Sequence, residues 1–221
     1  MSMRTRRRVG ILGTGGMADA LGTQWARAGH QVFVGGRNAG RAADLAHRIG
    51  AVGSGGLREA AEHGTDAVLL ALPYPVAAET VAALEVPLRG RVLIDCTNPV
   101  GPGFALVTAG GPSAARRMAS AAPAAHVVKA FNLCHEDVWR LTPPVFDGRP
   151  LAVPLCGDDE HALSVVRQLV RDLGCEPLNA GSLDRAALLE ATAALLIGLW
   201  VGEGADAQAI APPREFAGGR P

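Results

Sequence analysis

The chain has 221 residues, balanced charge (21 Lys and Arg against 21 Asp and Glu) and 48% hydrophobic residues with few aromatics. This length suits one large or two modest domains around an aliphatic core, and the neutral balance excludes the basic footprint of nucleic-acid-binding proteins and of basic membrane-binding faces. The four cysteines lack CxxC spacing, so we expect no disulfide framework, no metal site and a cytoplasmic location.

The strand expected at residues 9–12 leads into a glycine turn, and an amphipathic helix follows the turn. Strand, glycine turn and helix start form the context that the dinucleotide-binding fingerprint requires. The first glycine permits the tight turn, and the second lets the backbone approach a pyrophosphate at the helix N-terminus. The predicted phosphate-binding residues are Gly13, Thr14, Gly15, Gly16 and Met17.

The end of the second strand, residues 32–35, selects the cofactor. Sites that prefer NAD carry an acidic residue here to bind the ribose 2′-hydroxyl, but this chain has Gly36, Arg37, Asn38 and Arg41. Guanidinium groups form charge-assisted hydrogen bonds with phosphates. The sequence therefore predicts NADP(H) in preference to NAD(H), the alternative being that the arginines are merely solvated.

Strands and helices alternate along the rest of the chain, which predicts a doubly wound parallel α/β sheet of Rossmann type. We expect the cofactor domain at 8–150, a smaller C-terminal strand and helix lobe at 151–210, and flexible tails at 1–7 and 212–221. The apolar stretch 191–201 is shorter than the about twenty residues that cross a bilayer. We expect it to be buried against the sheet or against a second subunit, and the apolar helix motivates the prediction of a homodimer. The expected partner is a small-molecule substrate, with neither a nucleic acid nor a membrane.

The expected strands are 9–12, 32–35, 51–52, 66–72, 91–95, 126–132, 151–156 and 175–180, with helices at 40–49, 57–62 and 77–84, from Asp159 to Leu173, and after Ser182. Ligands of open parallel sheets lie beyond the carboxyl ends of the strands. The loops that follow these strands therefore supply further candidate cofactor contacts, namely Leu72, Pro73, Tyr74, Asn98, Pro99 and Phe131. For Tyr74 and Asn98, the alternatives are an incidental tyrosine and a turn-forming asparagine.

The catalytic candidates lie in and after the sixth expected strand. Lys129 is the sole lysine of the chain and falls in an apolar strand, where it is either an acid or base or a partner in an ion pair. Cys134 and His135 follow as candidate proton donors, with packing or surface roles as the alternatives.

Several motifs together resemble the deazaflavin (coenzyme F420)-dependent NADP reductase family, whose members are related to pyrroline-5-carboxylate reductase. The resemblance covers nearly the whole chain. Its marks are the runs 13–18, 35–37, 71–73, 127–132, 153–159 and 177–183. It implies hydride transfer between NADPH and F420 held in a stack, with Arg37 and Arg41 on the 2′-phosphate and the loops at Leu72 and Phe131 beside the nicotinamide. Such transfer depends mainly on proximity and orientation, so no acid–base dyad is required.

The chain departs from the family where the best-known members carry a His-Thr-Ile-Pro sequence, because it has Asn132-Leu133-Cys134-His135 there. Asn132 suits an amide contact to the nicotinamide carboxamide or to an electrophile. The expected function is an NADPH-dependent oxidoreductase that reduces F420 or a flavin. An imine or unsaturated-metabolite reductase is the alternative, and a non-catalytic NADP-binding redox sensor is the third interpretation.

Overall fold

The computed structural model describes residues 5–108, 110–206 and 210. Its main sheet has eight strands in the order β10-β9-β6-β5-β4-β1-β2-β3. The strands are β1 (Arg8–Leu12), β2 (Gln31–Gly35), β3 (Gly53–Gly55), β4 (Ala67–Leu70), β5 (Val92–Asp95), β6 (His126–Lys129), β9 (Ala152–Gly157) and β10 (Glu176–Gly181). The first six strands are parallel in the doubly wound order 3-2-1-4-5-6, which confirms the predicted fold class.

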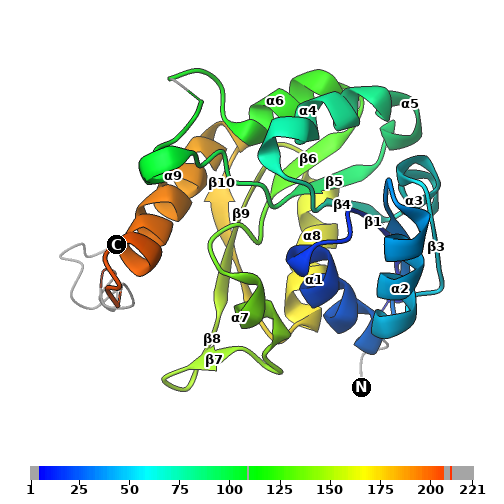
Figure 1. The fold of residues 1–221 in the computed structure, drawn as a ribbon, viewed down its shortest axis with the longest axis horizontal. Helices are drawn as coiled ribbons and strands as arrows, with labels where there is room; N and C mark the ends of the chain where they lie inside the picture. Colours follow the sequence, from blue (N-terminus) through cyan, green and yellow to red (C-terminus); the bar gives the residue numbers. More distant parts are fainter. Residues whose placement is uncertain (1–4, 109, 207–209, 211–221) are drawn as a thin grey trace.

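Helices cover both faces of the sheet (Figure 1). Their bounds are α1 (Gly16–Arg27), α2 (Ala39–Ile49), α3 (Leu57–His63), α4 (Tyr74–Ala83), α5 (Glu85–Leu88), α6 (Ala114–Ala121), α7 (Glu136–Arg140), α8 (Glu160–Asp172) and α9 (Ala186–Ile197). One core cluster packs α1, α2 and α8 against the sheet. The other cluster packs helices α3, α4, α5 and α6 and the start of α9 against the sheet. Successive strand residues such as Val127 and Val128 enter opposite clusters, because side chains alternate across a strand.

The segment after residue 150 continues the main sheet instead of forming a sheet of its own. β9 pairs antiparallel with β6, and β10 pairs parallel with β9. The predicted division at residue 150 therefore does not coincide with a break in the sheet. Before β9, the short strands β7 (Val145–Phe146) and β8 (Arg149–Pro150) form a separate hairpin that the sequence analysis did not predict.

The N-terminal tail departs from the prediction at one residue. The Arg7 backbone N–H donates to His30 Nδ1 at 3.1 Å, and its guanidinium pairs with Asp66, so the predicted N-terminal tail is fixed at residue 7. Residues 1–4 and 212–221 of the predicted tails lie outside the described residues.

The last helix is longer than the apolar stretch alone suggested. In the described ranges, the helical run Leu183–Gly202 is the single candidate for a membrane span by length and composition, with 20 residues, hydropathy 1.5 and 28% of it buried. The expectation that this stretch is too short to span a bilayer is therefore wrong on length. One such helix is weak evidence for a span, because core helices meet the same criterion.

Candidate active site

The glycine turn after β1 has a shape that only glycine permits. Gly13 has φ of +129°, and a Cβ on it would lie 2.1 Å from the Ala71 carbonyl oxygen. Gly15 caps α1 without a side-chain hydrogen bond, and a Cβ on it would meet nothing within 4 Å. The space beside Gly15 is therefore open, as the close approach of a pyrophosphate to the backbone requires.

The arginines after β2 are placed to hold a phosphate. Asn38 caps α2, because its Oδ1 accepts the Arg41 backbone N–H at 3.0 Å, so its side chain already has a structural role. Arg37 and Arg41 are exposed, and within the described part of the chain neither guanidinium has an ion-pair partner. A Cβ on Gly36 would lie 2.9 Å from Thr14 Cγ2, so this turn touches the glycine turn. These residues fit the 2′-phosphate end of NADP.

The proline-bounded loop after β4 starts a helix earlier than predicted. Pro73 caps α4, and the helix begins at Tyr74 instead of residue 77, since Pro75 is tolerated in a first helical turn. Leu72 and Tyr74 are half-buried and Pro73 is exposed. The large cavity described next is lined by none of these three residues, so their predicted contact with the cofactor stays a prediction.

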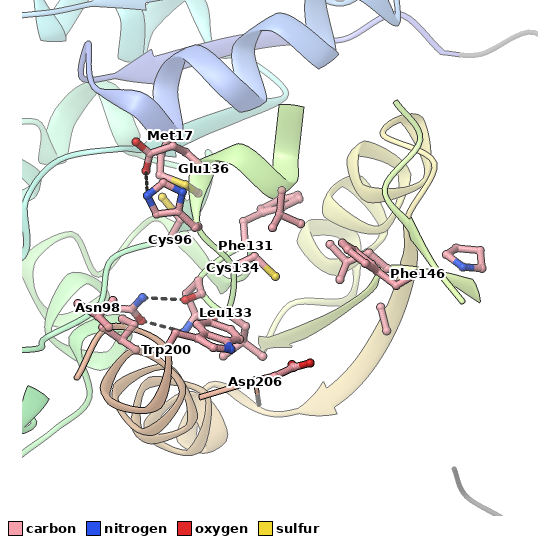
Figure 2. Close-up of a pocket in the computed structure, with 18 of the residues that line it drawn as sticks. Met17, Cys96, Asn98, Phe131, Leu133, Cys134, Glu136, Phe146, Trp200 and Asp206 are labelled. Carbon is pink, nitrogen blue, oxygen red and sulfur yellow. Dashed lines mark hydrogen bonds and ion pairs between the residues drawn. The ribbon is translucent and has the colours of Figure 1, made fainter. Parts of the chain in front are cut away.

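A mostly apolar cavity of about 880 Å³ opens beyond the carboxyl ends of β5 and β6. Figure 2 shows Met17 and Glu136 together at one end, with Trp200 and Phe146 on other walls. The structure brings three of the four catalytic candidates to this cavity, namely Asn132, Cys134 and His135. Other lining residues are Met17, Cys96, Asn98, Phe131, Leu133, Glu136, Val138, Phe146, Arg149, Pro150, Leu151, Ala152, Ile197, Trp200, Val201 and Asp206.

The backbone at Phe131 is held in an unusual conformation at the cavity floor. Its φ is +60°, a left-handed value that bulky residues rarely adopt. The ring is 1% exposed and makes edge contacts with Trp25 and Trp139, at centroid distances of 5.8 and 5.4 Å. Packing on both sides fixes the start of the loop, which turns Asn132 toward Asn98.

Asn98 and Asn132 join the loops after β5 and β6. Asn98 Nδ2 donates to the Asn132 backbone oxygen at 2.7 Å, and Asn132 Nδ2 donates to Asn98 Oδ1 at 3.0 Å. Asn132 Nδ2 also donates to the Leu189 carbonyl of α9 at 3.2 Å. Figure 2 shows Asn98 at the cavity wall, with dashed lines for its hydrogen bonds. Pro99, next in the chain, is buried.

Lys129 lies in the ion pair that the sequence analysis weighed against catalysis. Its side chain is 0% exposed, and Nζ is 3.0 Å from Asp95 Oδ2 and 3.1 Å from Glu190 Oε1. Glu190 also accepts the backbone N–H groups of Ala114 and Ala115, at the start of α6. Because Lys129 does not line the cavity, this geometry gives it a role in fastening α9 to the sheet and does not support the acid–base role.

The two candidate proton donors differ in environment. Burial raises the pKa of the Cys134 thiol to about 11, so this thiol stays protonated near neutral pH. The His135 side chain is 66% exposed, with ring nitrogens 3.6 Å from Glu136 Oε2 and 3.3 Å from Asp137 Oδ2. Of the two, His135 is therefore the one whose side chain is open to water.

Glu136 is a site residue that the sequence analysis missed. A Cβ on Gly16 would lie 2.2 Å from Glu136 Oε1, so this carboxylate rests against the N-terminus of α1. Favourable attraction between a carboxylate and the positive end of a helix dipole accounts for that position. The run His135-Glu136-Asp137, a capping residue and two acids, is a helix-start signal that could have revealed α7. The cavity walls from Phe146 and Trp200 had no comparable signal.

Residues 8–99 match the family described as coenzyme F420-dependent NADP oxidoreductases. The match confirms the resemblance predicted from the sequence, and the matched segment carries the glycine turn, both arginines and the Leu72 loop. The family description names NADP and F420, in agreement with the predicted cofactors.

Two curated relatives differ in the length they share with this chain. Metalloreductase STEAP3 of Rattus norvegicus is 33% identical over 193 residues, which cover 87% of this chain and 38% of that protein. The F420-dependent NADP reductase of Methanocaldococcus jannaschii is 30% identical over 149 residues, covering 64% of this chain and 65% of that protein. The chain thus spans less than two thirds of either relative.

Solved structures share the fold. A putative F420-dependent NADP reductase from Arthrobacter sp. FB24 superimposes with a TM-score of 0.79 at 23% identity, covering 90% of this chain and 95% of that one. A reductive aminase from Aspergillus terreus, in complex with NADPH, superimposes with a TM-score of 0.64 at 22% identity over 90% of this chain and 64% of that one. At these identities the likeness establishes the architecture alone.

Proposed function

We propose that this protein is an NADPH-dependent oxidoreductase that transfers a hydride between the nicotinamide and a planar deazaflavin (F420) or flavin. The observation that carries the proposal is the cavity of about 880 Å³ that begins at Met17, one residue past the start of α1, and is walled mainly by apolar side chains. Its volume and apolar walls suit a fused ring system. The name of the Methanocaldococcus jannaschii relative supports F420 as the acceptor.

The residues present fit NADP(H) at both of its charged groups. The glycine turn, open beside Gly15, would hold the pyrophosphate, and Arg37 and Arg41 would hold the 2′-phosphate. When bound, NADPH supplies the hydride. The chain's own contribution is to orient and to exclude water, through the rigid Phe131 loop and the apolar cavity walls.

The competing imine-reductase function is favoured by one observation, the exposed His135 at the cavity with two carboxylates nearby. In that reaction a proton must reach the nitrogen while hydride reaches carbon, so His135→Gln should lower turnover strongly. Hydride transfer between stacked rings should survive this change, because it needs no proton donor at that position.

Anaerobic stopped-flow absorbance with NADPH and, in turn, F420, FMN, FAD and riboflavin tests the proposal. Rapid loss of the acceptor band together with the 340 nm absorbance of reduced nicotinamide is expected for F420 or a flavin. NADPH binding without turnover of any of these acceptors would contradict it and favour an imine substrate. A redox sensor would bind NADPH without turning over any substrate.

A further inference from the structure

The orientation of the Asn132 amide is fixed by two backbone carbonyls. A carbonyl oxygen only accepts hydrogen bonds, so Asn98 must turn its NH₂ group toward the Asn132 backbone oxygen, 2.7 Å away. Asn98 Oδ1 is thereby left facing the Asn132 side chain. The Leu189 carbonyl of α9 is a second acceptor at 3.2 Å from Asn132 Nδ2. Both acceptors require Asn132 to present its NH₂ group to them.

Both hydrogens of Asn132 Nδ2 are therefore committed inside the protein, one to Asn98 Oδ1 and one to the Leu189 oxygen. A flipped amide would set Asn132 Oδ1 against two acceptors and lose both bonds. Asn132 consequently has no hydrogen left to donate to an electrophile in the cavity. This removes one of the two contacts that the sequence analysis considered for it.

Asn132 Oδ1 is the atom that remains for a ligand. In the described part of the chain, no residue donates a hydrogen bond to it, although the side chain lines the cavity. The buried side-chain polar atoms without a partner among the described residues are Arg7 Nε, Arg91 Nε and Trp139 Nε1, and Asn132 Oδ1 is not one of them. Oδ1 therefore keeps some accessible surface, on a side chain that lines the cavity.

We propose that Asn132 Oδ1 is a fixed hydrogen-bond acceptor for the carboxamide NH₂ of the nicotinamide. The inference rests on the proposed function, because it needs NADP(H) to bind at the glycine turn. Asn98, Cys96 and Met17 line the same cavity as Asn132, and Met17 lies in the first turn of α1. Asn132 is thus a specificity-determining residue that requires a donor on the ring substituent.

The test compares the binding of NADP⁺ with that of its 3-acetylpyridine analogue, in which a methyl group replaces the carboxamide NH₂. Dissociation constants are measured by isothermal titration calorimetry on the full chain. The wild-type protein should bind the analogue about five- to fiftyfold more weakly, because Oδ1 then loses its only donor. This comparison requires no variant. Equal affinity for the two dinucleotides would overturn the proposal.

Asn132→Ala provides the second arm, since the preference for NADP⁺ over the analogue should fall to within about twofold in this variant. A ratio cancels general weakening of the site, so a merely structural role for Asn132 would leave the preference intact and contradict the proposal. Asn98→Ala releases the orientation of the amide and should reduce the preference partway. The matched control is Thr192→Ala, an exposed residue of α9 outside the cavity, which should keep the full preference.

The fragment 2′,5′-ADP separates failure of this proposal from failure of the proposed function. Binding of the fragment and of NADP⁺, with no discrimination against the analogue, overturns only the role of Asn132. If the wild-type protein binds neither the fragment nor NADP⁺, both the inference and the proposed function fall.

Discussion

Replacing Lys129 with methionine should destabilise the protein severely, because two buried carboxylates would lose their shared cation. Asp95 is 0% and Glu190 is 1% exposed, and Lys129 Nζ lies 3.0 and 3.1 Å from them. Removing one partner of a buried ion pair typically costs about 3–5 kcal/mol, since the charge left behind is uncompensated. In a chain of this size each kcal/mol lowers Tm by about 2–4 °C, so Tm should fall by about 6–20 °C.

The free energy of unfolding can be followed by urea denaturation with fluorescence of the buried Trp25 and Trp139. Arg58→Met is the matched control, because Arg58 forms an exposed pair with Glu62 at 3.7 Å and should contribute less than about 1 kcal/mol. A loss below about 1 kcal/mol for Lys129→Met would refute the reasoning.

A double variant shows whether the charges act as one cluster. Glu190→Gln removes one of the two carboxylates that Lys129 neutralises, so adding it to Lys129→Met leaves a single unpaired carboxylate. The double variant should therefore lose less stability than the sum of the single losses, by about 0.5–3 kcal/mol. Strict additivity would show that Lys129 and Glu190 do not interact.

Four further predictions concern the cofactor, the thiols, the pH response and assembly. Arg37→Ala should weaken the binding of NADPH by about 1.5–3 kcal/mol, roughly 10- to 150-fold, and hardly change the binding of NADH, as measured by fluorescence titration. Equal losses of affinity for the two would contradict the phosphate assignment. With its pKa raised to about 11 by burial, Cys134 should react with iodoacetamide about tenfold faster for each pH unit between 8 and 10; a fast reaction already saturated at pH 8 would contradict that burial. Burial lowers the pKa of His30, although its partner Asp172 acts in the opposite direction. Because the unfolded chain therefore takes up a proton at higher pH than the folded chain, the free energy of unfolding should fall as the pH drops through about 6.5, by at most about 1.4 kcal/mol per pH unit. His30→Gln should flatten this slope, and an unchanged slope would refute the assignment. The exposed Leu195, 57% accessible on α9, motivates a homodimer that Leu195→Asp should dissociate, and a monomeric mass of the wild-type protein by light scattering at micromolar concentration would contradict it.

The sequence by itself determined the parallel part of the sheet and predicted the phosphate-binding end of the site. These features depend on local rules, because a turn such as Gly13 needs positive φ and a buried strand needs a continuous apolar run. The cofactor preference also came from local positions, since Arg37 and Arg41 lie next to the second strand in the chain itself. Spacing along the chain carried all of this information.

The tertiary structure decided how distant residues act on one another. Glu190 lies 61 positions after Lys129, and no local sequence pattern pairs them. Their contact nevertheless gives the candidate catalytic lysine a structural role in a buried ion pair. The orientation of the Asn132 side-chain amide likewise depends on backbone carbonyls of its own loop and of α9. The cavity exists only where α9, the β7–β8 hairpin and the Phe131 loop converge. Side-chain chemistry can be read from a sequence, but which hydrogens remain free to bind a ligand is set by partners that only folding brings together.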